Sequence, residues 1–218
     1  MNSGRNDGAM INALATIDKV SRKIAPGRAP YFIEAHLVKA LMTIDNESPV
    51  GRAKLAKSLG LGEGSIRTLI KHLEKGGLIQ TSKEGMMLTG TGQRLVSSLM
   101  AQMSSVIAVP RSSLTVSAFN MAILVKDAAS SMKAGLEQRD AAIRVGAQGA
   151  TTLIFSRGKL TMPSVKEDVF KDAPKVREII VSRLKPQEND LVVIGSANDG
   201  LTAEFGAIAA ALETLKAQ

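Results

Sequence analysis

The sequence predicts an α+β protein of two domains: a helical N-terminal domain that carries a short β-hairpin, and a C-terminal α/β sandwich. At 218 residues the chain is long for one domain and sufficient for two of about 100 residues each. Helical spacing dominates the first half, whereas strand-like and helical segments alternate in the second. The expected parts are an arm with a helix and a linker (1–29), the helical domain (30–103), an interdomain linker (104–112) and the sandwich (113–218).

The composition restricts the chemistry and the compartment. Hydrophobic residues make up 44% of the chain and aromatic residues only 3%, so the cores consist of Leu, Ile, Val, Met and Ala. The absence of cysteine excludes disulfides and thiolate metal sites, and it fits a reducing cytoplasm. The first ten residues lack the order of a signal peptide, and no apolar run approaches the ~20 residues that cross a bilayer. We therefore expect a cytoplasmic protein with no membrane segment, metal ion or cofactor.

The net charge of +8 indicates a polyanionic partner, and its distribution places that partner on the first half. Residues 1–103 carry 14 Lys and Arg against 8 Asp and Glu, whereas residues 104–218 carry 14 against 12. Residues 50–83 alone hold seven bases and two acids. The alternative is a solvated charged surface, which usually mixes the signs.

The N-terminal elements follow the order of a winged helix-turn-helix. Residues 9–24 show an amphipathic helical pattern, and the following APGRAP (25–30) is typical of a linker. The remaining expectations are helices over 31–45, 49–59 (starting at Pro49 after Ser48 as N-cap), 64–75 and 89–103, with a hairpin of LIQTS and MMLT around KEG after the third of them.

The helix over 64–75 is the candidate DNA-reading element. Ile66, Leu69, Ile70 and Leu73 follow i, i+3, i+4, i+7 spacing and predict its buried stripe. The opposite face carries small and basic groups suited to the major groove, with His72 beside them. Predicted base contacts are Ser65, Arg67, Thr68 and Lys71, and predicted phosphate contacts are Arg52, Lys54, Lys57, Lys75 and Lys83. The alternative for this helix is a solvated outer face.

A resemblance to known families supports this interpretation. The shared residues are Gly51-Arg52 before Leu55-Ala56, Arg67, Gly77-Leu78-Ile79, and Gly85-Met86 followed by Thr89. They resemble the winged helix of archaeal regulators with an uncharacterised C-terminal domain, and that resemblance extends to GAQGATTLIF and VVIGSANDG. The same stretch is similar to the N-terminal domain of the bacterial central glycolytic genes regulator, whose large sugar-binding domain is absent here. The resemblance implies DNA binding and regulation, and no activity for the second half.

The second half predicts a strand over 114–125, a helix over 127–145, a hairpin of 151–156 and 159–162, a helix over 174–184, a strand over 190–195 and a helix over 201–216. This βαββαβ order with a final helix is that of a ferredoxin-like or related sandwich. Without His or Cys, residues 104–218 exclude Cys-His dyads, Ser-His-Asp triads and His-ligated metals.

One candidate effector pocket lies in this half. On the helix over 127–145, Arg139 is expected to project into an apolar stripe of Ala129, Met132, Leu136 and Ile143, where it must meet an acid or an anion. The pocket combines it with the GSANDG turn: Arg139, Asp140, Gly195, Ser196, Asn198, Asp199 and Glu204. The structural alternatives are an ion pair of Arg139 with Glu204 or Asp140, and a turn that caps the last helix.

Together these features predict a non-enzymatic, sequence-specific regulator that binds double-stranded DNA as a homodimer, with a C-terminal domain that senses a small-molecule effector or mediates assembly. The helix with Leu95, Leu99 and Met103 either pairs two chains or packs in the core of one. The first rival is an α/β small-molecule-binding or enzymatic protein whose winged helix mediates protein contacts. The second is a general nucleic-acid binder of chromatin type.

Overall fold

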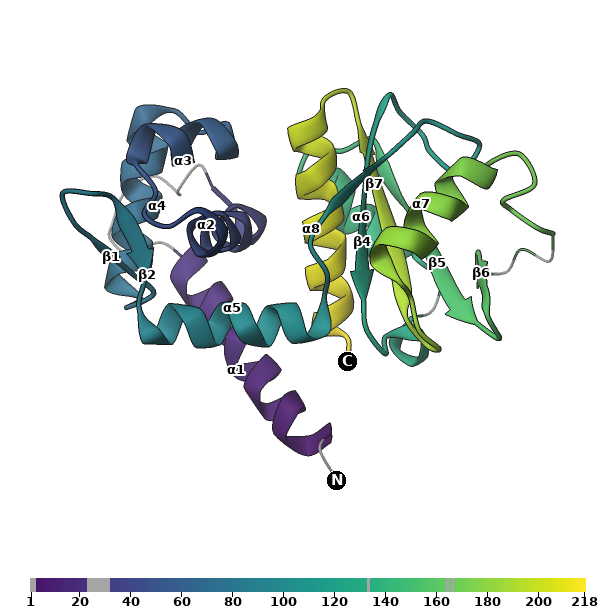
Figure 1. The fold of residues 1–218 in the computed structure, drawn as a ribbon, viewed down its shortest axis with the longest axis horizontal. Coiled ribbons are helices and arrows are strands. Elements are labelled where there is room, and N and C mark those ends of the chain that lie inside the picture. The colour runs from purple at the N-terminus through teal and green to yellow at the C-terminus, as the bar shows by residue number, and fades with distance from the viewer. Residues whose placement is uncertain (1–2, 23–31, 133, 164, 166) are drawn as a thin grey trace. The chain divides into compact units, whose positions relative to one another are not determined.

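The computed structural model describes residues 3–22, 32–132, 134–163, 165 and 167–218 (Figure 1). The chain divides into two compact units, Met1–Met100 and Ala101–Gln218. Helices dominate the first unit, and the second is built on one large sheet. The α+β class is therefore confirmed. The predicted linker over 25–30 lies outside the described residues.

The N-terminal unit follows the predicted order of elements. They are α1 (Ser3–Ser21), α2 (Glu34–Glu47), α3 (Arg52–Leu59), α4 (Glu63–Lys75), β1 (Ile79–Thr81), β2 (Met86–Leu88) and α5 (Gly90–Gln102). The apolar stripes of the helices meet in a core in which Leu41, Leu55 and Leu69 are fully buried. The α1 helix contributes Ile17 and Val20 to the buried set. Burial of these stripes, rather than helix propensity, stabilises such short helices.

The segment before α3 is extended, which corrects the predicted helix start at Pro49. The α3 helix begins at Arg52 because Val50 pairs with Met86 of β2. The N–H of each residue donates to the carbonyl oxygen of the other, at 3.0 and 2.9 Å, and this pairing fixes a strand conformation. Gly85 permits the approach: its φ is +141°, and a Cβ there would lie 2.9 Å from the Val50 backbone.

The C-terminal unit is a five-stranded antiparallel sheet with three α-helices in its described residues. Its elements are β3 (Ile107–Val109), β4 (Phe119–Val125), a 3-10 turn (Ala129–Ser131), α6 (Leu136–Arg144), β5 (Gly149–Ser156), β6 (Lys159–Thr161), α7 (Pro174–Leu184), β7 (Leu191–Ala197) and α8 (Gly200–Lys216). The strand order is β3-β4-β7-β5-β6. The β3 strand lies in the segment 104–112 predicted as a linker, so this segment is part of the sheet.

The strand order differs from the ferredoxin-like arrangement. In a ferredoxin-like sheet the last strand lies at an edge beside the first. Here β7 is central and pairs with β4 on one side and β5 on the other. The chain crosses from β4 through α6 to β5, and β7 lies between these two strands. This is a split βαβ unit, as in a ferredoxin-like sheet, but a different strand occupies the position between the two.

Helices cover both faces of this sheet (Figure 1). Val192 and Ile194 of β7 face α7 in one apolar cluster, whereas Ala197 packs with α6 and α8 in the other. All of β7 is buried, as expected for a strand covered on both sides. At Gly195 the sheet and α8 approach so closely that a Cβ would lie 2.5 Å from the carbonyl oxygen of Ala203.

Candidate nucleic-acid interface

The α4 helix buries one face and exposes the other, as its spacing predicts. Ile66, Leu69 and Leu73 are fully buried, and Ile70 is half-buried. Across the helix the side chains of Arg67, Thr68, Lys71 and Lys75 are exposed, together with Gly64, and Ser65 is half-buried. The core contact therefore determines which face of α4 is accessible to a partner.

A groove of about 750 Å³ lies between α4, the start of α3 and the β1–β2 hairpin. It brings together Arg67 and Lys71 of α4, Arg52 of α3 and Lys83 of the hairpin, all of them exposed. The other predicted contacts are outside this lining, on the same two helices: Lys54 and Lys57 on α3, and Ser65, Thr68 and Lys75 on α4. The structure thus joins three separate segments of the predicted surface.

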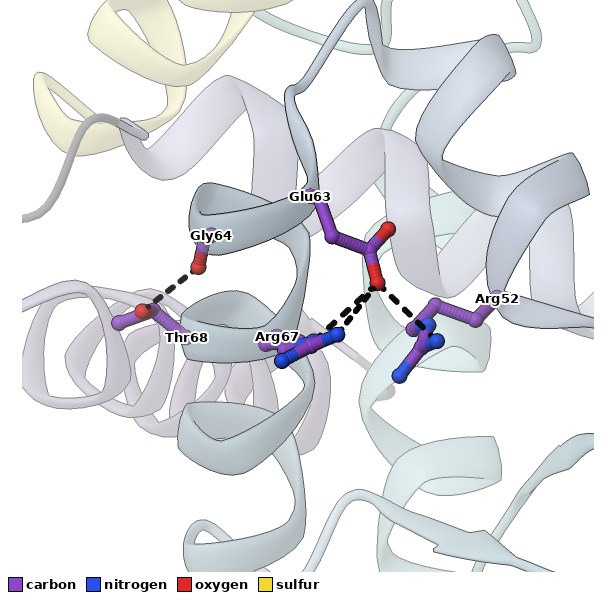
Figure 2. Close-up of polar contacts among 5 residues, drawn as sticks. All are labelled: Arg52, Glu63, Gly64, Arg67 and Thr68. Carbon is purple, nitrogen blue, oxygen red and sulfur yellow. Dashed lines mark hydrogen bonds and ion pairs between the residues drawn. The ribbon is translucent and has the colours of Figure 1, made fainter.

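Two of the acidic side chains that line the groove, Glu63 and Glu74, are engaged with polar groups around it. Glu63, in the first turn of α4, accepts hydrogen bonds at Oε1 from Nε of Arg67 at 3.1 Å and from Nη2 of Arg67 at 2.9 Å. The same oxygen lies 3.0 Å from Nη2 of Arg52 (Figure 2). Glu74 accepts from the Thr81 hydroxyl at 2.6 Å, which joins the end of α4 to β1.

Two further predicted contacts, besides the two arginines, have partners of their own. The hydroxyl of Thr68 donates to the Gly64 carbonyl oxygen at 3.0 Å (Figure 2). That hydrogen bond orients the hydroxyl along the helix and leaves the Thr68 methyl group available for an apolar contact. The ammonium of Lys54 pairs with Glu47 of α2 at 2.5 Å. Both residues of that pair are exposed, so it contributes little to stability.

His72 is not on the exposed face, which corrects its placement beside the basic residues. It is buried, and its Nδ1 lies 2.7 Å from the Val20 carbonyl oxygen. Its ring packs edge-to-face on Phe32, with 5.0 Å between the ring centroids. Sequence spacing placed His72 beside the basic face, and the contact with α1 decides its burial.

The premise of the predicted effector pocket is wrong, because Arg139 is exposed. Residues 126–132, 134 and 135 form turns, bends and a short 3-10 segment rather than the first half of a long helix, so Ala129 and Met132 do not continue the stripe of α6. The buried face of α6 consists of Gln138, Ala141 and Ala142, while Leu136 is 56% exposed. Asp140 is exposed as well, and Glu204 on α8 is half-buried.

The GSANDG turn is a helix cap with a satisfied network. Asp199 is the N-cap of α8 and accepts from the N–H of Thr202 at 2.8 Å and from its hydroxyl at 2.7 Å. These two donors, the N–H first, hold the pKa of Asp199 below its ordinary value. Ser196 is buried and donates to Asn120 at 2.7 Å, and Asn198 accepts from Ser117 at 3.0 Å. The alternative interpretation of this segment, a turn that caps the last helix, therefore accounts for these residues.

A separate apolar hollow of about 390 Å³ lies between the β5–β6 hairpin and α7. Phe155, Leu160 and Phe170 supply apolar walls, and Arg177 and Glu178 supply polar groups. None of the predicted effector residues lines it. Among the described residues no group of three His, Cys, Asp or Glu is placed to bind a metal ion, and no helix there has the length and apolar character needed to span a membrane.

The helix considered for dimerisation is packed within the chain. Leu95 and Leu99 of α5 are buried, and Met103 just beyond α5 is fully buried. The structure therefore favours the core role of this stripe. Gly92 shows how tightly α5 packs, since a Cβ there would meet the carbonyl oxygen of Leu78.

Sequence reasoning missed Glu63 as a member of the site. The predicted helix started at residue 64, so the first-turn carboxylate fell outside it. The i, i+4 spacing of Glu63 and Arg67 was the available signal for an ion pair. The second contact, with Arg52, joins two helices and has no signature in the sequence.

Comparisons with known proteins agree with this two-part organisation. Residues 37–103 match the CggR N-terminal DNA-binding domain, and residues 116–215 match a domain of unknown function, DUF4443. The first match confirms the similarity to the DNA-binding domain of the glycolytic regulator and indicates a DNA-binding regulator. The second leaves the role of the C-terminal unit open. No curated protein matches the chain.

Among solved structures, a hypothetical protein from Pyrococcus horikoshii OT3 is similar along most of the chain. It is 27% identical, with a TM-score of 0.65, over 84% of this chain and 98% of that one. The activation domain of the phage T4 transcription factor MotA aligns over 41% of this chain and 86% of that one at 22% identity. Its TM-score of 0.30 is too low to support an argument.

Proposed function

We propose that this protein is a transcription regulator that binds double-stranded DNA sequence-specifically, with α4 in the major groove and the β1–β2 hairpin as a wing on the backbone. The observation that carries the proposal is the groove at which exposed cations of α3, α4 and the hairpin meet. It lies within a domain whose sequence matches a DNA-binding domain.

The composition of the α4 face supports this docking. A B-DNA major groove is about 12 Å wide and admits one α-helix. The small Gly64 and Thr68 lie on the exposed face, so the helix backbone is able to approach the base edges closely. Arg67 then meets guanine O6 and N7, the Thr68 methyl meets a thymine methyl, and Ser65 and Lys71 complete the base contacts.

The remaining cations suit phosphates. Arg52, Lys54 and Lys57 lie on α3, Lys75 at the end of α4 and Lys83 in the hairpin, and all are exposed. Phosphate contacts fix the register on the duplex and supply affinity without reading sequence. We assign the C-terminal unit a regulatory rather than catalytic role. The hollow beside α7 supports a small apolar effector, since its volume falls within the range of ligand pockets.

The test is capture of fragmented genomic DNA from the source organism by the purified chain at two salt concentrations, followed by sequencing. Sharp enrichment of sites that share a motif at the higher salt is the expected result. An inverted repeat in that motif would reveal the expected homodimer, because two-fold symmetric proteins bind two-fold symmetric sites. Diffuse capture that disappears with salt would reduce the interaction to phosphate binding and contradict the proposal.

A matched pair of variants assigns the capture to the groove. Arg67→Ala removes a cation that lines it, and Arg183→Ala removes another exposed cation, from α7 in the other unit. We expect Arg183→Ala to capture the same sites as the unmodified chain, and Arg67→Ala to capture them more weakly with a motif relaxed at one base pair. Loss of the motif in both variants would indicate dependence on net charge rather than on the groove.

A further inference from the structure

The contact between Glu63 and Arg67 uses one specific edge of the guanidinium. A guanidinium has five N–H donors: one on Nε and two on each of Nη1 and Nη2. Glu63 Oε1 engages Nε and Nη2, which form the side edge of Arg67 (Figure 2). One hydrogen of Nη1 and the second hydrogen of Nη2 lie on the end edge. The end edge is suited to forked bonds with O6 and N7 of guanine.

The same carboxylate oxygen also binds Arg52. Its Nη2 lies 3.0 Å from Glu63 Oε1, so one acidic group holds a predicted base-reading arginine and a predicted phosphate-binding arginine at once. Without Glu63, both guanidinium groups would be free to turn toward the phosphate backbone of any duplex. With Glu63 in place, phosphates meet a negative charge between the two arginines.

We infer that Glu63 is a positioning residue that gives α4 its sequence selectivity, by aligning Arg67 for guanine and by holding Arg52 from phosphates of unrelated DNA. This inference rests on the proposed function. Glu63 acts in two opposite directions: it favours the specific complex through alignment of Arg67 and disfavours non-specific complexes through its charge. Its effect therefore appears in the ratio of the two affinities.

The contribution of these ion pairs to the stability of the fold is too small to explain the arrangement. The side chains of Glu63, Arg67 and Arg52 are between 51% and 63% exposed. Exposed ion pairs of this kind contribute little to folding. Glu63→Gln, which keeps the shape of the side chain, should therefore leave the thermal midpoint of the full chain unchanged, and folding does not confound the binding test.

The experiment compares Glu63→Gln with Glu74→Gln in the full-length chain. Glu74 lies on the same helix and lines the same groove, and it accepts a hydrogen bond from the Thr81 hydroxyl rather than from an arginine. Each variant removes one negative charge from the groove. Binding is measured against a duplex carrying the captured motif and a scrambled duplex of equal length and composition, over a range of salt concentrations.

We expect Glu63→Gln to lower the ratio of specific to scrambled affinity by about tenfold, a loss within the discrimination of one bidentate guanine contact. Its binding to scrambled DNA should become tighter, with a salt slope steeper by about one unit because Arg52 becomes available to a phosphate. Glu74→Gln should keep the ratio of the unmodified chain. In an Arg67→Ala background, Glu63→Gln should lower the ratio by less, because only the release of Arg52 remains.

The other outcomes overturn the inference in separable ways. An equal change of the ratio in Glu63→Gln and Glu74→Gln would show that only charge matters and would overturn the positioning role. An unchanged ratio in Glu63→Gln, with a motif still bound by the unmodified chain, would overturn the inference and leave the proposed function intact. If the unmodified chain prefers no sequence, the proposed function fails and the inference fails with it.

Discussion

Nδ1 of His72 lies 2.7 Å from the carbonyl oxygen of Val20, and this buried hydrogen bond joins the α4 helix to the end of α1. A carbonyl oxygen only accepts, so Nδ1 carries the proton and the histidine tautomer is determined by its partner. Gly76 completes the contact, since a Cβ there would lie 2.7 Å from a Val20 methyl group. The α1 helix is therefore an integral part of the N-terminal unit.

Replacement of His72 by alanine should destabilise this unit. The change removes a buried hydrogen bond and the ring that packs on Phe32, and it leaves a cavity. We expect a loss of about 2–4 kcal/mol in the free energy of unfolding, measured by urea denaturation. The control is Lys71→Ala, the exposed neighbour, which should stay within about 0.5 kcal/mol of the unmodified chain. Equal stability of the two variants would contradict the structural role of His72.

The DNA contacts of α4 and the hairpin should differ in kind. Arg67→Ala should weaken the specific site by about 1–3 kcal/mol and relax the preference at one base pair. Lys83→Ala should weaken specific and scrambled duplexes alike and reduce the salt slope by about one unit. Fluorescence anisotropy titrations with single-base variants of the motif measure both effects. Unchanged base preference in Arg67→Ala would show that another face of the protein reads the sequence.

The stability of the N-terminal unit should fall in mild acid through His36. Burial, and then the charge of Lys39, lowers the pKa of His36 from 6.5 to about 4. The unfolded chain therefore binds a proton between those pH values before the folded chain does, and stability falls as the pH decreases from 6.5 toward 4. The slope has an upper bound of about 1.4 kcal/mol per pH unit, and partial exposure of the ring reduces it.

The matched variant for this pH effect is His36→Gln. His36 Nδ1 accepts from the N–H of Ile33 at 3.3 Å, and glutamine preserves an acceptor at that helical position without titrating. Urea unfolding of the two proteins between pH 7.5 and 4 isolates the histidine from the carboxylates that also titrate. Parallel stability curves for the two proteins would contradict the lowered pKa.

Gly195 should be intolerant of a side chain. A Cβ there would lie 2.5 Å from the carbonyl oxygen of Ala203 and 2.5 Å from the N of Ala207, both of them backbone atoms of α8. Gly195→Ala must separate β7 from α8, and we expect a loss of about 1–3 kcal/mol or more. Gly149→Ala on β5 meets only a Val116 methyl at 3.4 Å and should cost less. Thermal unfolding of the two variants provides the comparison.

Local periodicity accounts for the parts of the site that the sequence predicted. Ile66, Leu69 and Leu73 recur at helical spacing, so the buried face of α4 and the exposure of Arg67 and Lys71 on the opposite face were predictable. The contacts that bring α3, α4 and the hairpin together were not predictable in this way. The groove depends on the pairing of Val50 with β2, and such non-local contacts leave no pattern along the chain.

The C-terminal unit shows the same limit. The order of strands and helices along the chain was predictable from their composition. The position of β7 between β4 and β5 depends on contacts between residues far apart in the sequence, which the sequence pattern does not show. Arg139 was misplaced because a helix was extended backwards through residues 127–135. Gly135 adopts a φ of +78° just before α6. This left-handed conformation is incompatible with a helix that continues through residue 135, so α6 begins after it.

The exchange of hydrogen bonds between Val50 and Met86 has a consequence for how the protein fits a duplex. It ties the base of the hairpin to the backbone that leads into α3, so the hairpin does not pivot independently of the helices. The spacing between Arg67 and Lys83 is then a property of the folded protein rather than of the DNA. Because the hairpin is ordered when the protein folds, DNA binding does not have to order it, and the conformational entropy lost on binding is smaller. A target with one base pair inserted between the two contacts would lose one of them rather than be accommodated.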